Sequence, residues 1–140
     1  MRLIFSLLLS LFVGVSQPAV AGAGDEMVAA DDFRFELNII NMHEAEQYVG
    51  NPDVLFYDVN TLELWSEGFI PNAIHFFVED WERLLPEDKN KLMIFYCANR
   101  LCNASELAAY AVMKKGYTNV RQMPDGIFGW RMSGRQVELP

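Results

Sequence analysis

Two short apolar runs most constrain the fold that this chain can adopt. Residues 54–59 (VLFYDV) and 92–96 (LMIFY) are apolar at odd and even positions alike, apart from Asp58. Alternate residues of a strand point to opposite faces of a sheet, so such runs are typical of strands that are buried on both faces. Helical patterns separate the strand candidates along the chain. We therefore predict a three-layer α/β fold in which helices cover both faces of a mostly parallel central sheet.

Shorter patterns predict the remaining elements. Asn41 precedes Glu44 by three residues, which is a variant of the capping box, and Gly50 is placed to end the helix that follows. The clearest helix is expected to be capped by Asn103 and to end at Gly116. Its apolar stripe is expected to consist of Leu107, Ala108, Ala111 and Val112. Other short elements are expected at residues 37–40, 73–76, 81–85 and 119–122.

Residues 1–21 have the pattern of a secretory signal peptide. Arg2 supplies a short positive region, residues 3–15 are almost wholly apolar, and residues 19–21 (AVA) form an A-x-A cleavage signature. An uncleaved N-terminal anchor is the alternative, although the apolar run is short for a helix that spans a bilayer. The pattern predicts an exported protein, either periplasmic or secreted.

The rest of the chain is expected to hold a flexible lead-in, residues 22–32, and a single domain, residues 33–140. Nineteen acidic residues outnumber eleven basic ones in the whole chain, which gives a formal net charge of -8. Loss of Arg2 with the signal peptide makes the mature chain more negative still. Such an acidic surface argues against nucleic acid or an anionic membrane as a partner.

Cys97 directly follows the apolar run 92–96 and is the principal candidate for a catalytic residue. Parallel α/β sheets bind their ligands at the carboxyl ends of the strands. Residues 97–102 (CANRLC) then form a short loop that leads into a helix. Such a loop directs backbone N–H groups towards an anion beside the positive end of the helix. This field favours the thiolate, which is the nucleophilic form of cysteine.

From about residue 35 to residue 138, the order and spacing of these pieces resemble the single-domain rhodaneses. The matching segments are Asp58-Val59, residues 68–75 (GFIPNAIH), the loop that opens with Tyr96-Cys97, and residues 125–130 (DGIFGW). The chain departs from the usual family pattern at Asn60, Phe69, Asn72, Ala98, Arg100 and Cys102. The resemblance implies a rhodanese-like three-layer fold.

The resemblance also implies a sulfurtransferase. The Cys97 thiolate would take the sulfane sulfur of a donor such as thiosulfate as a persulfide, and would pass it to a thiophilic acceptor. The loop residues that would bind the persulfide and the donor are Ala98, Asn99, Arg100, Leu101 and Cys102. The partners are then a small anionic sulfur donor, a thiol acceptor and a thiol reductant. We expect no cofactor, and no metal because the C-x4-C spacing lies outside that of structural zinc sites.

Cys102 leaves other interpretations open. A thiol five residues after Cys97 could resolve a persulfide or a sulfenate by forming a disulfide. The protein would then be a dithiol–disulfide oxidoreductase, or a sulfurtransferase that oxidation switches off. The pair could instead be a small structural disulfide. A non-catalytic rhodanese-like binding module is a third alternative. Asp58 is expected at the same sheet edge as Cys97, either as a supporting group or as an acceptor for neighbouring backbone amides.

Overall fold

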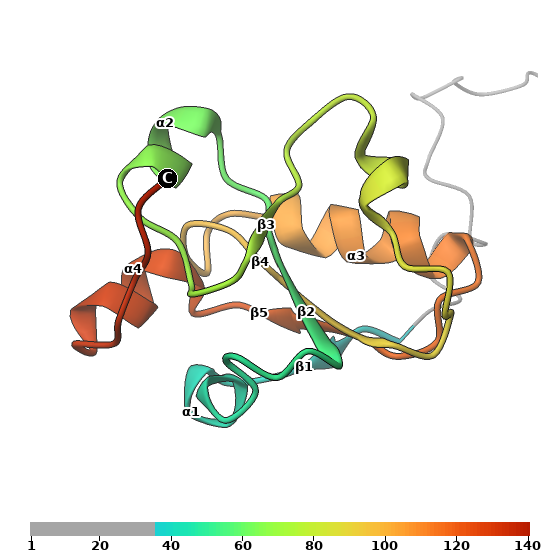
Figure 1. Cartoon of the computed structure of the whole chain (residues 1–140), viewed down its shortest axis with the longest axis horizontal. Coiled ribbons are helices and arrows are strands. Elements are labelled where there is room, and N and C mark those ends of the chain that lie inside the picture. The colour runs from blue at the N-terminus through green and yellow to red at the C-terminus, as the bar shows by residue number, and fades with distance from the viewer. Residues whose placement is uncertain (1–35) are drawn as a thin grey trace, which may run out of the picture. The chain divides into compact units, whose positions relative to one another are not determined.

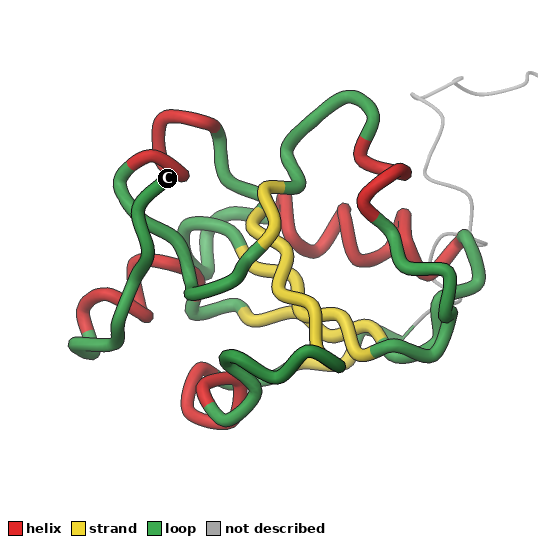
Figure 2. Tube along the Cα trace, viewed as in Figure 1, coloured by secondary structure: helices red, strands yellow, loops and turns green. Residues whose placement is uncertain are grey.

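The computed structural model describes residues 36–140, so the predicted signal peptide (1–21) and lead-in (22–32) lie outside the described residues. Within the described part, five parallel strands form one sheet in the order β1-β5-β4-β2-β3. The strands are β1 (Asn38–Ile39), β2 (Val54–Asp58), β3 (Ile74–His75), β4 (Leu92–Tyr96) and β5 (Val120–Met123). Figure 2 shows them at the centre of the domain, with helices and loops around them.

Helices cover both faces of this sheet, which confirms the predicted three-layer α/β fold. The helices are α1 (Met42–Glu46), α2 (Leu62–Ser66), the 3-10 helix η2 (Trp81–Leu84), α3 (Ala104–Lys114) and α4 (Gly126–Met132). In Figure 1, α3 and α1 lie on opposite sides of the strands. Within residues 36–140, no helix has the length and apolar character needed to cross a membrane.

Each face of the sheet carries its own apolar core, as the doubly apolar strands require. Tyr57 and Phe95 pack on the α3 side, together with residues of α3 and η2. Their chain neighbours Phe56 and Ile94 pack on the other side, against α1 and α4. The strand period of two separates the two cores. The carboxyl ends of β2 and β4 therefore carry side chains that face different layers.

Some predicted details differ from the structure. Neither α2 nor α4 was predicted, because α2 is too short to show a periodic pattern and α4 begins at Gly126, within a run of turn-forming residues. Asn103 is the N-cap residue of α3, but its side chain makes no capping hydrogen bond. The predicted stripe on α3 was wrong at Leu107, which is 60% exposed. The buried face of α3 instead contains the polar residue Ser105, with Ala109 and Val112.

Candidate active site

Cys97 lies at the middle of the carboxyl edge of the sheet, directly after β4, which has β5 on one side and β2 on the other. Its side chain is 1% exposed and belongs to the core on the α3 side. The loop that follows connects β4 to α3, the longest helix of the described part. The thiol predicted from the sequence therefore lies at the position where parallel sheets bind ligands.

The first turn of α4 holds the beginning of this loop in place. The Ile127 N–H donates to the Cys97 carbonyl oxygen at 2.8 Å, and the Phe128 N–H donates to the Ala98 carbonyl oxygen at 3.0 Å. Gly126 allows this approach, because a Cβ atom there would lie 2.4 Å from the Ala98 carbonyl oxygen. Its φ of +64° also favours glycine. The glycine of the closing DGIFGW segment thus has a direct structural role beside Cys97.

Asn99 turns the loop back on itself. Its side-chain Oδ1 accepts the Leu101 N–H at 2.9 Å, and its carbonyl oxygen accepts the Cys102 N–H at 3.1 Å. The turn brings Cys102 to Cys97, with 6.4 Å between the two Cα atoms, and the two residues form a disulfide. This distance lies within the usual range for bridged cysteines. The pairing that the sequence left open is therefore present in this structure.

A buried polar side chain, Ser105, contacts the sulfur of Cys97, and a second one, Gln122, contacts Ser105. Ser105 Oγ lies 3.5 Å from Cys97 Sγ, and Gln122 Nε2 donates to Ser105 Oγ at 3.0 Å. The Ser105 hydroxyl thus donates its one proton to Cys97 Sγ while its oxygen accepts from Gln122. In general, a hydrogen-bond donor placed against a cysteine sulfur favours the thiolate over the thiol.

Neither Ser105 nor Gln122 was predicted as a site residue from the sequence. Ser105 lies in the first turn of α3 and Gln122 lies in β5, so they meet Cys97 only through the tertiary fold. The one signal in the sequence was a serine at a position where the rest of the buried helix face is apolar.

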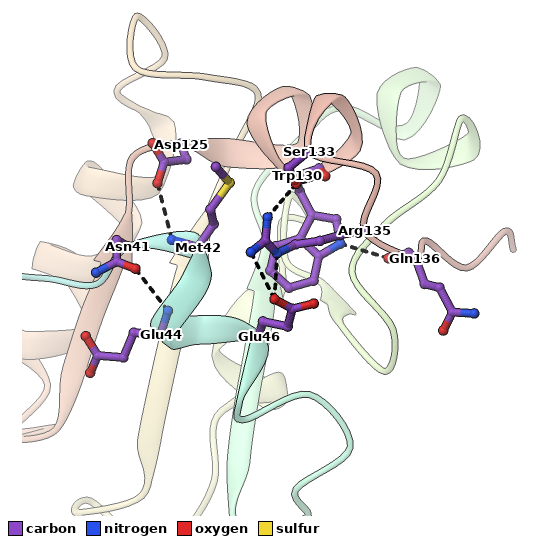
Figure 3. A network of polar contacts seen from close by, with 9 residues as sticks. All are labelled: Asn41, Met42, Glu44, Glu46, Asp125, Trp130, Ser133, Arg135 and Gln136. Atoms are coloured by element: carbon purple, nitrogen blue, oxygen red, sulfur yellow. Dashed lines mark hydrogen bonds and ion pairs between the residues drawn. The ribbon is translucent and has the colours of Figure 1, made fainter.

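Arg100 is paired rather than free. Its Nη2 atom lies 2.5 Å from Asp125 Oδ1, and its side chain is 70% exposed. The other carboxylate oxygen of Asp125 accepts the Met42 N–H at 3.3 Å, so this residue links the loop to the start of α1. Figure 3 shows the Asp125 carboxylate directed at Met42, the first residue of α1, and shows the ion pair of Arg135 with Glu46, the last residue of α1. In this structure Arg100 therefore holds the loop against Asp125.

The predicted binding residues differ in the backbone N–H groups that they can offer to a ligand. Leu101 and Cys102 donate within the loop, to Asn99. The N–H groups of Ala98, Asn99 and Arg100 donate to no acceptor in residues 36–140. These three N–H groups are therefore not used in hydrogen bonds within the described part.

Asp58 ends β2 and pairs in register with Tyr96, at the same edge of the sheet as Cys97. By strand alternation, however, Asp58 shares the face of Phe56, which packs on the α1 and α4 side, whereas Cys97 belongs to the core on the α3 side. Asp58 Oδ1 accepts the Asn60 N–H at 2.8 Å, which is the amide-accepting role considered from the sequence. Burial raises the pKa of the Asp58 carboxyl above its usual value. Asp58 thus accepts a backbone amide at the end of β2, and within residues 36–140 no hydrogen bond joins it to Cys97.

Comparisons with known proteins agree with this geometry. The Rhodanese-like domain family matches residues 41–133, which is more than half of the chain. A tRNA uridine(34) hydroxylase from Hamiltonella defensa is 27% identical over 108 residues, covering 72% of this chain. The chain spans only 30% of the length of that relative.

Two solved structures share the fold. The BH2092 protein from Bacillus halodurans has a TM-score of 0.64 at 24% identity, covering 73% of this chain and 77% of its own. The 3-mercaptopyruvate sulfotransferase SseA from Escherichia coli has a TM-score of 0.60 at 15% identity, covering 75% of this chain and 51% of its own. At these identities the likeness shows the fold alone. With the match over residues 41–133, the conclusion is that the chain belongs to the rhodanese-like domain family.

Proposed function

We propose that this domain is a sulfurtransferase, which moves sulfane sulfur from a donor such as thiosulfate to a thiophilic acceptor through a persulfide on Cys97. The observation that carries the proposal is the position of Cys97 at the carboxyl end of β4, with the Ser105 hydroxyl directed at its sulfur. A buried hydroxyl donor beside a thiol favours the thiolate that such chemistry requires.

The reaction has two displacement steps. The Cys97 thiolate attacks the outer sulfur of thiosulfate, the bond between the two sulfurs of the donor breaks, and sulfite leaves with its electron pair. The product is a Cys97 persulfide. An acceptor nucleophile then attacks the outer sulfur of the persulfide and restores the Cys97 thiolate, which is ping-pong covalent catalysis.

Backbone N–H groups supply the local positive field for this chemistry. The N–H groups of Ala98, Asn99 and Arg100 are free to hold the donor oxygens and the persulfide, which supports an anionic donor despite the acidic surface of the chain. The overall charge of -8 also favours a small sulfur donor over tRNA, on which the hydroxylase relatives act by name. Export, if residues 1–21 act as a signal, adds a need for a thiol reductant outside the cytoplasm.

Steady-state kinetics test the proposal. Reduced and desalted Cys102→Ser protein is expected to form thiocyanate from thiosulfate and cyanide, with parallel lines in double-reciprocal plots at several donor concentrations. Cys97→Ser is expected to form none. Turnover by Cys97→Ser at the rate of Cys102→Ser would overturn the proposal, as would the absence of thiocyanate from both proteins.

The Cys97–Cys102 disulfide favours a second candidate, a dithiol–disulfide oxidoreductase. In that case both thiols exchange electrons with the thiols of a partner, and no sulfur atom is transferred. Retention of sulfur by reduced Cys102→Ser protein after exposure to thiosulfate distinguishes the two candidates, because only the sulfurtransferase carries a persulfide on Cys97.

A further inference from the structure

We propose that Cys102 is a resolving cysteine, which attacks the Cys97 persulfide and releases the transferred sulfur as hydrosulfide. The domain then reduces thiosulfate to sulfite and sulfide at the expense of a dithiol reductant. This inference rests on the proposed function, because it needs the Cys97 persulfide, and it assigns the fate of the sulfur that the persulfide carries.

The geometry of the loop supplies the first argument. Cys102 Sγ is bonded to Cys97 Sγ, so the loop conformation that places Cys102 against the inner sulfur of a persulfide is the one seen in this structure. The Asn99 turn and the α4 hydrogen bonds to the Cys97 and Ala98 carbonyls hold that conformation. No rearrangement of β4 or α3 is needed to bring the two sulfurs together.

The reaction balances without any further oxidant. The Cys102 sulfur attacks Cys97 Sγ, the bond between Cys97 Sγ and the outer sulfur breaks, and the outer sulfur leaves with the electron pair. The thiol proton of Cys102 goes to the leaving sulfur, which gives hydrosulfide. The sulfane sulfur is reduced by two electrons, and the two cysteine sulfurs are oxidised to the disulfide.

The surroundings of the loop favour both the release of hydrosulfide and the later reduction of the disulfide. The free N–H groups of Ala98, Asn99 and Arg100 can stabilise the charge that develops on the departing sulfur. Cys102 is partly exposed, whereas Cys97 is 1% exposed, so an external thiolate reaches the disulfide at Cys102. Its attack there expels the Cys97 thiolate towards the Ser105 hydroxyl, which is the favourable direction for exchange. A dithiol reductant then completes the cycle.

A single-turnover experiment tests the inference. Wild-type, Cys102→Ser, Cys102→Ala and Cys97→Ser proteins are reduced, desalted without oxygen and mixed with thiosulfate, and sulfite and sulfide are measured in the filtrate. Wild type is expected to release equimolar sulfite and sulfide and to lose two hydrogen atoms in mass. Both Cys102 variants are expected to release sulfite only and to gain one sulfur atom. A wild-type sample without thiosulfate controls for oxidation by air.

Trypsin reports where the sulfur is, because Arg100 lies between the two cysteines. Peptides 92–100 and 101–114 stay linked if the disulfide has formed. Wild-type protein that releases sulfite but keeps the sulfur on peptide 92–100, without sulfide, overturns this inference and leaves sulfur transfer intact. Sulfur on peptide 101–114 also overturns it, because Cys102 has then attacked the outer sulfur. Absence of sulfite from every sample overturns the proposed function itself.

Discussion

Replacing Ser105 by alanine removes the hydroxyl that lies 3.5 Å from Cys97 Sγ. A hydrogen bond to a charged group contributes about 1.5–3 kcal/mol, and the lower limit suits a contact of this length. That free energy corresponds to about a tenfold smaller thiolate fraction at a pH where the thiol is mostly protonated. The thiolate that remains is more nucleophilic, because its pKa is higher, and this partly compensates for the smaller thiolate fraction. With a Brønsted coefficient of about 0.45, the net rate is about 3.5-fold lower.

The same reasoning reverses at high pH. Once Cys97 is fully ionised in both proteins, Ser105→Ala is expected to react about threefold faster than its parent, because no hydrogen bond lowers the nucleophilicity of its thiolate. The rate profiles of the two proteins therefore cross. A mutation that only loosens the packing around Cys97 lowers the rate by a similar factor at every pH.

The assay is the rate of sulfite release from thiosulfate over a range of pH, with Cys102→Ser as the parent protein so that only Cys97 reacts. Ser66→Ala is the matched control, since it removes an exposed hydroxyl that donates to the Glu63 carbonyl on α2. The control is expected to follow the parent throughout. Profiles of Ser105→Ala that coincide with the parent, or that run parallel below it, refute the role given to this hydroxyl.

Three further predictions concern stability. Gly126→Ala is expected to lower the free energy of unfolding by at least about 2 kcal/mol in urea titrations, because of its φ of +64° and the clash with the Ala98 carbonyl; an unchanged midpoint contradicts this. Asp58 has a raised pKa in the folded state, so its contribution to stability is lost as pH rises above about 3.9, the unfolded value, and through the folded pKa. Asp58→Asn is expected to remove that component of the pH dependence of unfolding, and an identical dependence refutes the assignment. The Cys97–Cys102 disulfide closes only a short loop, so its reduction is expected to lower the free energy of unfolding by only about 2 kcal/mol, measured by thermal melts of oxidised and reduced protein.

Much of the fold could be predicted because it follows from local patterns. The two doubly apolar runs indicated strands covered on both faces, and β2 and β4 lie at those runs. Cys97 was identified because it follows β4 directly, and the carboxyl end of a parallel strand is a ligand-binding position. The short helices α2 and α4 left no comparable pattern in the sequence.

The rest of the candidate site depends on tertiary contacts. Ser105 and Gln122 come from a helix and a strand that meet only when α3 packs on the sheet. The face on which Asp58 lies depends on the register that pairs it with Tyr96, which a single sequence does not specify. The contact of Asp125 with Arg100 likewise joins residues that are 25 positions apart.

The mass of the tryptic peptide 92–100 from reduced Cys102→Ser protein after exposure to thiosulfate decides whether Cys97 carries sulfur. Digestion and analysis are carried out without reductant, with Cys97→Ser treated in parallel. If the domain transfers sulfur, this peptide gains one sulfur atom at Cys97, cyanide removes that atom as thiocyanate, and Cys97→Ser gains none. A peptide that stays unmodified, while the oxidised wild-type protein still exchanges its disulfide with a dithiol, would contradict sulfur transfer and leave thiol–disulfide exchange as the chemistry of this site.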